Sequence, residues 1–169
     1  KLYDQDSDVT GLSTGYKDLD AMTTGLHKDE LIILAARPGV GKTAFVLNVA
    51  QNAATKSNAT VAMFSLEMSA ESLVNRMLCP EGSIDANALR TGKLDENQWN
   101  SLVVAMGSLS RTNIYIDDTP GIKMAEIRSK CRRLLKESGH LDLVVIDYLQ
   151  LMELVKKIDN KKFQLFHVI

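Results

Sequence analysis

The segment that most constrains this chain is a glycine-containing loop between an apolar run and a helical pattern. The loop reads Ala36-Arg37-Pro38-Gly39-Val40-Gly41-Lys42-Thr43, and residues 31–35 before it and 44–47 after it are all apolar. A strand, a glycine loop and a helix in this order form a cradle for phosphate groups. The strict pattern has a glycine where Ala36 stands, and the plain alternative is a glycine turn before a surface helix. The strand and helix patterns on either side favour phosphate binding.

The residue types in this loop match the chemistry of a nucleoside triphosphate. Gly39 and Gly41 allow backbone N–H groups to turn toward phosphate oxygens, and the helix that starts near Lys42 directs its positive dipole end to the same anion. Lys42 is expected to reach the β- and γ-phosphates, and the Thr43 hydroxyl is expected to bind Mg²⁺.

Composition limits the remaining possibilities. The 169 residues, 45% of them apolar, suffice for one domain with a buried core. The formal net charge of −1 gives no global signal for nucleic acid binding.

Cys79 and Cys131 lack ligand-like spacing, so we expect two reduced thiols. Residues 1–8 lack the apolar core of a signal peptide, and no run of about eighteen apolar residues occurs, so we expect a cytoplasmic protein without a membrane partner.

Strand and helix patterns alternate along the chain, as in a parallel sheet with crossover helices. Ser69 is a predicted N-cap, and Asp95 with Gln98 predicts a capping box. An apolar stripe of Ile127, Cys131, Leu134 and Leu135 is expected to pack one helix on the sheet. Strands are predicted at residues 31–35, 60–65, 114–116 and 143–146, and helices at residues 43–55, 70–79, 96–107 and 124–138. The predicted fold class is α/β, with a mostly parallel sheet flanked by helices.

An acid follows the last predicted strand. Residues 143–146 are all apolar, as in a buried parallel strand, and Asp147 stands at their carboxyl end. Ligands of open α/β sheets bind at that edge, so Asp147 is expected to hold Mg²⁺ beside Thr43. An acid in this position can also be a helix cap or a turn residue, but the phosphate loop upstream favours the metal role.

A second acid, Glu67, follows the strand predicted at residues 60–65. Because Lys42, Thr43 and Asp147 account for nucleotide and metal, Glu67 is the candidate base that orients and deprotonates the attacking water. The alternative role is an acid that stabilises the N-terminus of the helix beginning after Ser69.

Several blocks of residues follow one another in a recognisable order. They are TGYKDLD at 14–20, AARPGVGKTAF at 35–45, FSLEMS at 64–69, LRTG at 89–92, IDDTPG at 116–121, SKCRRL at 129–134 and VIDYLQL at 145–151. Together, from about Thr10 to Leu151, they resemble the C-terminal motor domain of bacterial replicative DNA helicases of the DnaB type. That family also accepts alanine at the position of Ala36.

The resemblance implies a RecA-like P-loop NTPase fold. It implies that Ala36 to Thr43 form the ATP loop, that Lys42 and the hydrolytic Glu67 are catalytic, and that Asp147 is the Walker B aspartate. It further implies a homohexamer around single-stranded DNA, 5′–3′ translocation, duplex unwinding at the replication fork, and primosome contacts with primase and a helicase loader.

The resemblance ends after Met152. A basic DNA-binding loop, a strand with a glutamine that senses the γ-phosphate, and an arginine finger are expected there, and none is recognisable, so the core is expected to be incomplete. The missing strand normally lies between the Walker A and Walker B strands. We hypothesise that residues 163–169 fill this gap as a substitute strand, with residues 153–160 as a short crossover.

These expectations divide the chain into three parts. Residues 1–12 are predicted to be a remnant of an interdomain linker, residues 13–152 the N-terminal part of the ATPase domain, and residues 153–169 an atypical tail.

The predicted function is ATP binding and slow hydrolysis by a helicase motor domain that is truncated after the Walker B strand. Two alternatives remain: a module that does not unwind DNA but joins or interferes with full-length rings, and a P-loop kinase, which transfers phosphate to an acceptor other than water.

One group of basic residues and a single arginine have plain alternatives as well. Arg128, Lys130, Arg132, Arg133 and Lys136 crowd one helix, where a solvated face competes with contact to DNA or a neighbouring subunit. Arg76 is placed to approach a nucleotide base or phosphate, and ordinary surface solvation explains it equally.

Overall fold

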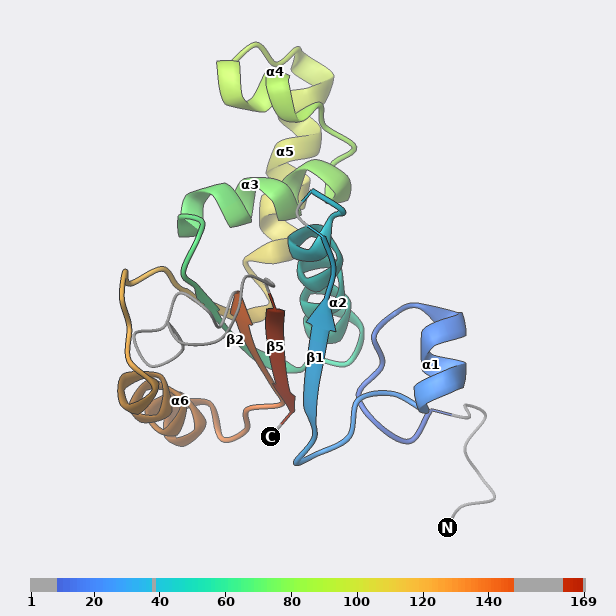
Figure 1. Ribbon diagram of the computed structural model, residues 1–169. Helices are drawn as coiled ribbons and strands as arrows, with labels where there is room; N and C mark the ends of the chain where they lie inside the picture. Colours follow the sequence, from blue (N-terminus) through green and yellow to red (C-terminus); the bar gives the residue numbers. More distant parts are fainter. Residues whose placement is uncertain (1–8, 38, 148–162, 169) are drawn as a thin grey trace.

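The chain folds around one five-stranded sheet covered by helices on both faces. The computed structural model describes residues 9–37 and 39–147, and the backbone of residues 163–168. The strands are β1 (Leu31–Ala35), β2 (Thr60–Ser65), β3 (Asn113–Asp117), β4 (Leu143–Asp147) and β5 (Phe163–Val168), in the spatial order β1-β5-β4-β2-β3. The helices are α1 (Lys17–Thr23), α2 (Lys42–Lys56), α3 (Ala70–Glu81), α4 (Ala86–Thr91), α5 (Glu96–Leu109) and α6 (Met124–Ser138). Figure 1 shows α2 and α6 on opposite sides of the sheet.

The predicted α/β class is confirmed, and every predicted strand and helix is present within two residues at each end. The predicted N-cap Ser69 accepts a hydrogen bond from the Ser72 N–H, and Asp95 with Gln98 forms the predicted capping box. Cys79 and Cys131 are both free thiols. Two short helices were not predicted, because α1 buries only Asp20 and α4 buries no residue. Neither helix therefore has the apolar stripe on which the prediction depended.

The sheet combines a parallel part with one antiparallel strand. β2 pairs in parallel with both β3 and β4. β5 pairs antiparallel with β1 and with β4, so it lies in the gap where the hypothesis placed residues 163–169. A strand that directly follows its neighbour along the chain can return antiparallel without a crossover. Residues 153–160, the predicted crossover, lie outside the described residues.

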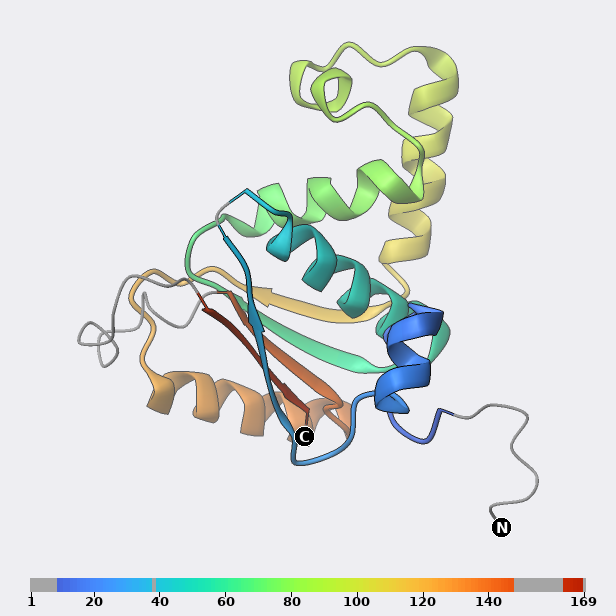
Figure 2. The same cartoon turned by 45° about the vertical axis from the view of Figure 1, so that its right-hand side comes forward.

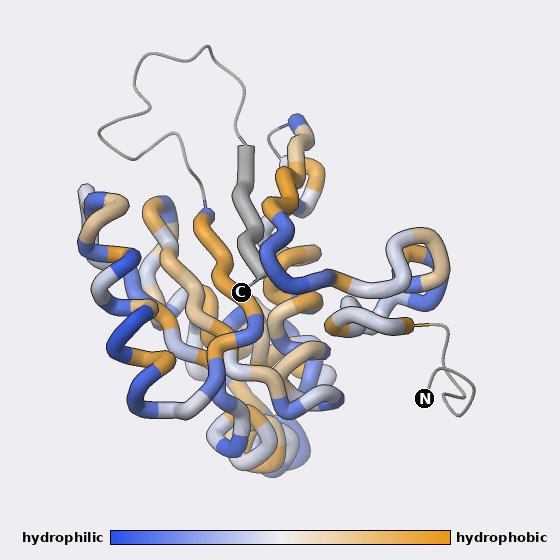
Figure 3. The backbone as a smooth tube through the Cα atoms, turned by 90° about the horizontal axis from the view of Figure 1, so that it is seen from below, coloured by the Kyte–Doolittle hydropathy of each residue, from blue (hydrophilic) through white to orange (hydrophobic). Residues whose placement is uncertain are grey.

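Alternate residues of the central strands face two separate cores. Val61, Met63 and Val145 pack beneath α2 and α3, whereas Ala62 and Phe64 pack against α6. Figure 2 shows the helices on both faces, and Figure 3 shows hydrophobic colour along the central strands. Strands buried on both faces read as continuous apolar runs, which is why they were predictable.

The apolar stripe of α6 is narrower than predicted. Ile127, Cys131 and Leu134 are buried against the sheet, but Leu135 is 41% exposed. The prediction for Leu135 was therefore wrong, because the next position along a helix turns about 100° away from its neighbour.

The helices α3, α4 and α5 extend beyond the sheet (Figures 1 and 2). They enclose a small core of their own, formed by Leu78, Ile84, Leu102 and Ala105. Among the described residues, no helix combines the length and the apolar character needed to cross a membrane.

A buried carboxylate holds the turn before α1. Asp20 is 5% exposed and accepts hydrogen bonds from the Thr14 hydroxyl (2.6 Å), the Thr14 N–H (2.9 Å) and the Ser13 hydroxyl (2.7 Å). The Asn52 side chain donates to the Thr14 carbonyl (3.1 Å), which ties this turn to α2. Burial raises the pKa of Asp20, but the hydrogen bonds from Thr14 and Ser13 outweigh it, so the pKa lies below its ordinary value of 3.8.

Replacing Asp20 with alanine is expected to lower the free energy of unfolding by about 2–4 kcal/mol, because three donors lose a charged acceptor. A carboxylate with a lowered pKa stabilises the fold above its ordinary pKa, and this contribution is lost as pH falls through the folded-state pKa. The difference in free energy of unfolding between wild type and Asp20→Ala should therefore have its largest value at pH 7 and decrease below about pH 4. Urea denaturation across this range measures it. The exposed Asp18→Ala on the same helix is the control, and equal losses in both variants would contradict the assignment.

Candidate nucleotide site

The two glycines of the loop adopt a backbone conformation that glycine favours. Gly39 and Gly41 have φ values of 79° and 96°, in the left-handed region that favours glycine. No atom lies within 4 Å of a Cβ built on either residue, so both face open space. Gly41 is the N-cap of α2 and supplies no side-chain cap, which leaves the first N–H groups of α2 directed at the loop. Pro38 lies outside the described residues.

The Lys42 side chain extends along this loop. Its Nζ donates to the Ala36 carbonyl (2.9 Å) and to the Arg37 carbonyl (3.4 Å). The Val40 N–H also donates to the Arg37 carbonyl (3.4 Å), which closes the turn. The ammonium group therefore lies against the start of the loop, with its charge beside the backbone that would surround a phosphate.

Thr43 and Asp147 meet although they are far apart in the chain. The Thr43 hydroxyl donates to Asp147 Oδ2 at 3.0 Å across a sequence separation of 104 residues. Asp147 is 1% exposed and ends β4, while Thr43 is in the first turn of α2. A hydroxyl and a carboxylate oxygen are hard ligands that suit Mg²⁺.

The hydroxyl of Thr43 and the carboxylate of Asp147 match the small number of protein groups that typically hold a phosphate-bound Mg²⁺. Within residues 9–37 and 39–147, no group of three or more His, Cys, Asp or Glu side chains is placed to hold a metal ion. Mg²⁺ in nucleotide sites is held by one or two protein groups together with phosphates and water, so a larger cluster is not required.

Glu67 lies at the same edge of the sheet. Sheet register pairs Ser65, the last residue of β2, with Asp147, and the Leu66 N–H donates to the Asp147 carbonyl (2.7 Å). Glu67 follows directly and is exposed. Its backbone therefore leaves the sheet beside the Thr43 and Asp147 pair.

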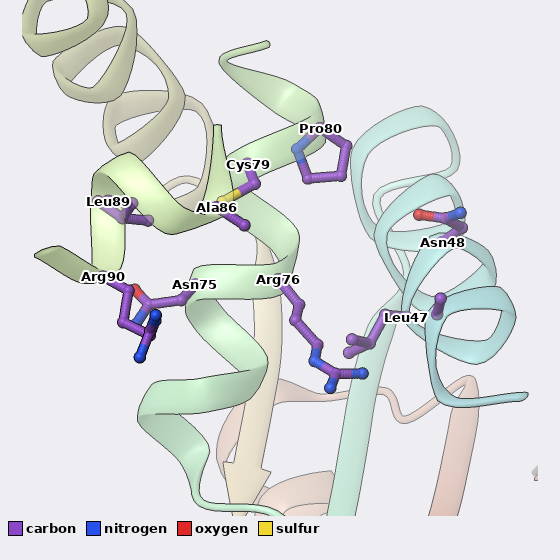
Figure 4. Close-up of a pocket in the computed structure, with 10 residues that line it drawn as sticks. Leu47, Asn48, Asn75, Arg76, Cys79, Pro80, Ala86, Leu89 and Arg90 are labelled. Atoms are coloured by element: carbon purple, nitrogen blue, oxygen red, sulfur yellow. The ribbon is translucent and has the colours of Figure 1, made fainter. Parts of the chain in front are cut away.

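A cavity of about 360 Å³ adjoins the start of α2. Ala44, the residue after Thr43, lines it together with Arg76 and Cys79 of α3 and Leu89 of α4. Figure 4 shows the Arg76 side chain extending from α3 toward Leu47 of α2. Arg76 is exposed and also lines this pocket next to the loop, so both of its predicted roles stay open.

Two acidic residues at this sheet edge were not assigned a role from the sequence. Asp117 ends β3 and forms an ion pair with Lys130 of α6, while Asp118 accepts a hydrogen bond from the Ala70 N–H at 2.8 Å. Lys130 is therefore not only part of a solvated charged face. An acid at the carboxyl end of a strand, the pattern used for Asp147, was the signal that could have identified them.

Comparison with known proteins agrees with this geometry. The family model "DnaB-like helicase C terminal domain" matches residues 11–168, beyond the end of the sequence blocks at Leu151. The replicative DNA helicase DnaC of Bacillus subtilis is 60% identical over 153 residues, which are 90% of this chain and 34% of that protein. The replicative DNA helicase DnaB of Geobacillus stearothermophilus is 60% identical over 90% of this chain and 33% of that protein. The chain thus spans about a third of the length of these curated relatives.

Solved structures share the fold. One solved ATPase domain superposes with a TM-score of 0.81 at 33% identity, over 94% of this chain and 57% of that one. A structure of a DnaB-like replicative helicase and its interactions with primase gives a TM-score of 0.83 at 34% identity, over 94% of this chain and 39% of that one. With its glycine loop, its paired Thr43 and Asp147, and a family match along nearly its whole length, the chain belongs to the DnaB-like helicase C-terminal domain family.

Proposed function

We propose that this chain binds ATP with Mg²⁺ and hydrolyses ATP as part of a replicative DNA helicase motor. The observation that supports the proposal most directly is the 3.0 Å contact between Thr43 and Asp147 beside an open glycine loop. Residues 104 positions apart are brought together, as the binding of one phosphate-bound metal ion by both would require.

The residues of the loop bind and orient the triphosphate. Backbone N–H groups around Gly39 and Gly41 and the N-terminus of α2 donate to phosphate oxygens, and Lys42 adds a positive charge at the β- and γ-phosphates. Residues Ala36 to Thr43 together form this cradle. The cavity lined by Arg76 provides space for the nucleoside next to it.

Thr43 and Asp147 would hold Mg²⁺, which when bound neutralises charge on the phosphates. Glu67 orients the attacking water and accepts its proton. This division of roles leaves Lys42 and Glu67 as the catalytic residues.

The activity of a whole helicase extends beyond these residues. By analogy with the replicative DNA helicases it matches, we propose that the protein to which this domain belongs forms a hexameric ring, translocates 5′–3′ on single-stranded DNA in the cytoplasm and unwinds the replication fork. Primase and a helicase loader are the proposed partners, and the primase contact described for the DnaB-like relative supports the former. An arginine finger from a neighbouring subunit contributes about 10³–10⁵ to the rate in related systems, so the isolated chain should hydrolyse ATP slowly.

The metal role is tested by replacing Thr43 with alanine. ATP affinity is expected to rise on addition of Mg²⁺ in the wild type, and Thr43→Ala or Asp147→Asn should reduce this gain about tenfold. Titration of a fluorescent ATP analogue with Mg²⁺ or with EDTA measures the gain. Thr55→Ala, the same change near the far end of α2, is the control. Equal Mg²⁺ dependence in all variants would contradict the assignment.

The kinase alternative has a separate test. Phosphate transfer from ATP to an acceptor other than water would favour a kinase.

A further inference from the structure

The segment that bears Glu67 is short and is held at several points. It runs from the end of β2 at Ser65 to the start of α3 at Ala70. The Ser65 hydroxyl donates to the Met68 carbonyl (2.7 Å) and accepts from the Met68 N–H (3.2 Å). The Leu66 N–H is bonded to the Asp147 carbonyl at 2.7 Å. These contacts hold the first half of the segment to the sheet.

The second half is held by a residue from another strand. Asp118, directly after β3, accepts a hydrogen bond from the Ala70 N–H at 2.8 Å, across 48 residues of sequence. Ala70 is the first residue of α3, whose opening N–H groups have no partner within the helix. The Ser69 hydroxyl accepts from the Ser72 N–H, so Asp118 satisfies a different donor, the Ala70 N–H. Its carboxylate also adds negative charge at the positive end of the helix.

Asp118 is itself fixed through its neighbour. Asp117 forms an ion pair with Lys130 of α6 and accepts from the Thr119 N–H (3.1 Å), and Lys130 also donates to the Thr119 hydroxyl (3.3 Å). Partial burial raises the pKa of Asp117, but the hydrogen bonds from Lys130 and Thr119 outweigh this effect. The pKa of this carboxyl therefore lies below its ordinary value. The loop after β3 is thereby anchored to α6.

We infer that Asp118 is a positioning residue for Glu67, acting through its hydrogen bond to the Ala70 N–H. The inference rests on the proposed ATPase function, because it assigns Glu67 the role of base. A general base must be held to within about 0.5 Å of its working position, so a segment that moves more freely at one end loses rate. The sheet holds the segment at Ser65, and Asp118 holds it at Ala70.

The hydrogen bond is tested by hydrogen exchange of the whole chain, without any need for hydrolysis. In Asp118→Ala the amides of residues 66–72 should exchange about tenfold faster, because a hydrogen bond to a charged acceptor is lost. Asp118→Asn retains an acceptor oxygen at the same place and should remain within about threefold of the wild type. Unchanged exchange in residues 46–54 of α2 reports that the fold is intact. No change in Asp118→Ala, or an equal rise in Asp118→Asn, would overturn the inference.

The link to Glu67 is tested by a double-mutant cycle in single-turnover ATP hydrolysis. Asp118→Ala should lower the rate of the chemical step about tenfold with ATP affinity unchanged, and Asp118→Asn should restore most of that rate. In a Glu67→Gln background the same alanine change should have an effect of less than about twofold, since residues that act as a unit are non-additive. Equal losses in both backgrounds would show that Asp118 does not act through Glu67. Absence of hydrolysis in the wild type would refute the ATPase proposal, while the exchange experiment still decides whether Asp118 holds the segment.

Discussion

Replacing Lys42 with alanine is expected to weaken binding of an ATP analogue in Mg²⁺ about 100-fold, the largest effect on affinity that the site predicts. Two charge-assisted hydrogen bonds to phosphate oxygens are lost, and at the lower limit of about 1.5 kcal/mol for each bond their sum corresponds to about 100-fold in affinity. Lys42 donates to the Ala36 and Arg37 carbonyls, both within the loop itself, so the ammonium is already close to where the phosphates would bind. Isothermal titration calorimetry with a non-hydrolysable analogue measures the affinity.

The matched control for this change is on the same helix. Lys56 is the last residue of α2 and is exposed at the end opposite the loop. Lys56→Ala removes the same charge and should leave ATP affinity within about threefold, because exposed charges more than a Debye length of about 10 Å away are screened. Similar losses in both variants would show that overall charge, rather than the loop, determines binding.

The second large effect is on rate. Glu67→Gln should reduce the single-turnover rate of ATP hydrolysis by about 10²–10⁴, the usual contribution of a general base, because the amide cannot accept the proton of the attacking water. The side chain keeps its size, so ATP affinity should stay within about threefold of the wild type. Release of inorganic phosphate with enzyme in excess over ATP measures the chemical step separately from product release.

An acid in the first turn of the next helix serves as the control. Glu71 of α3 is exposed, lies four residues after Glu67, and favours the N-terminus of that helix. If Glu67 only stabilised this helix, Glu67→Gln and Glu71→Gln would have similar and small effects on hydrolysis. A rate loss confined to Glu67→Gln supports the role of base.

Much of the fold could be predicted because it depends on local patterns. The strands β2 and β4 each contain a continuous apolar run and are buried throughout. The capping residues Ser69 and Asp95 marked two helix starts, since their side chains accept hydrogen bonds from N–H groups only three residues away. The helices α1 and α4 were missed because each is short and has few or no buried residues.

The members of the site and the proximity of Thr43 to Asp147 were predictable, but most of the contacts around them were not. The residue types of the loop, the acid after β4 and the acid after β2 identified Lys42, Asp147 and Glu67 as candidates. Their roles stay predictions, although the structure brings Thr43 and Asp147 within hydrogen-bond distance. The ion pair of Lys130 with Asp117 was not foreseen, because helical spacing alone shows a charged face and not its partner.

By itself, the sequence determined the strand–loop–helix cradle, the alternation of strands and helices, and the family, since each depends on residue types within a short window or on the order of such windows. Tertiary structure alone decided that Asp118 meets Ala70 and that Lys130 pairs with Asp117. It also supplied the contact of Thr43 with Asp147 and the pairing of β5 with β1 and β4, which the sequence had suggested only as expectations. The physical reason is that parallel strands align their carboxyl ends at one edge of the sheet. Strand order therefore determines which side chains separated by about a hundred residues are neighbours, and a short window of sequence does not contain that order.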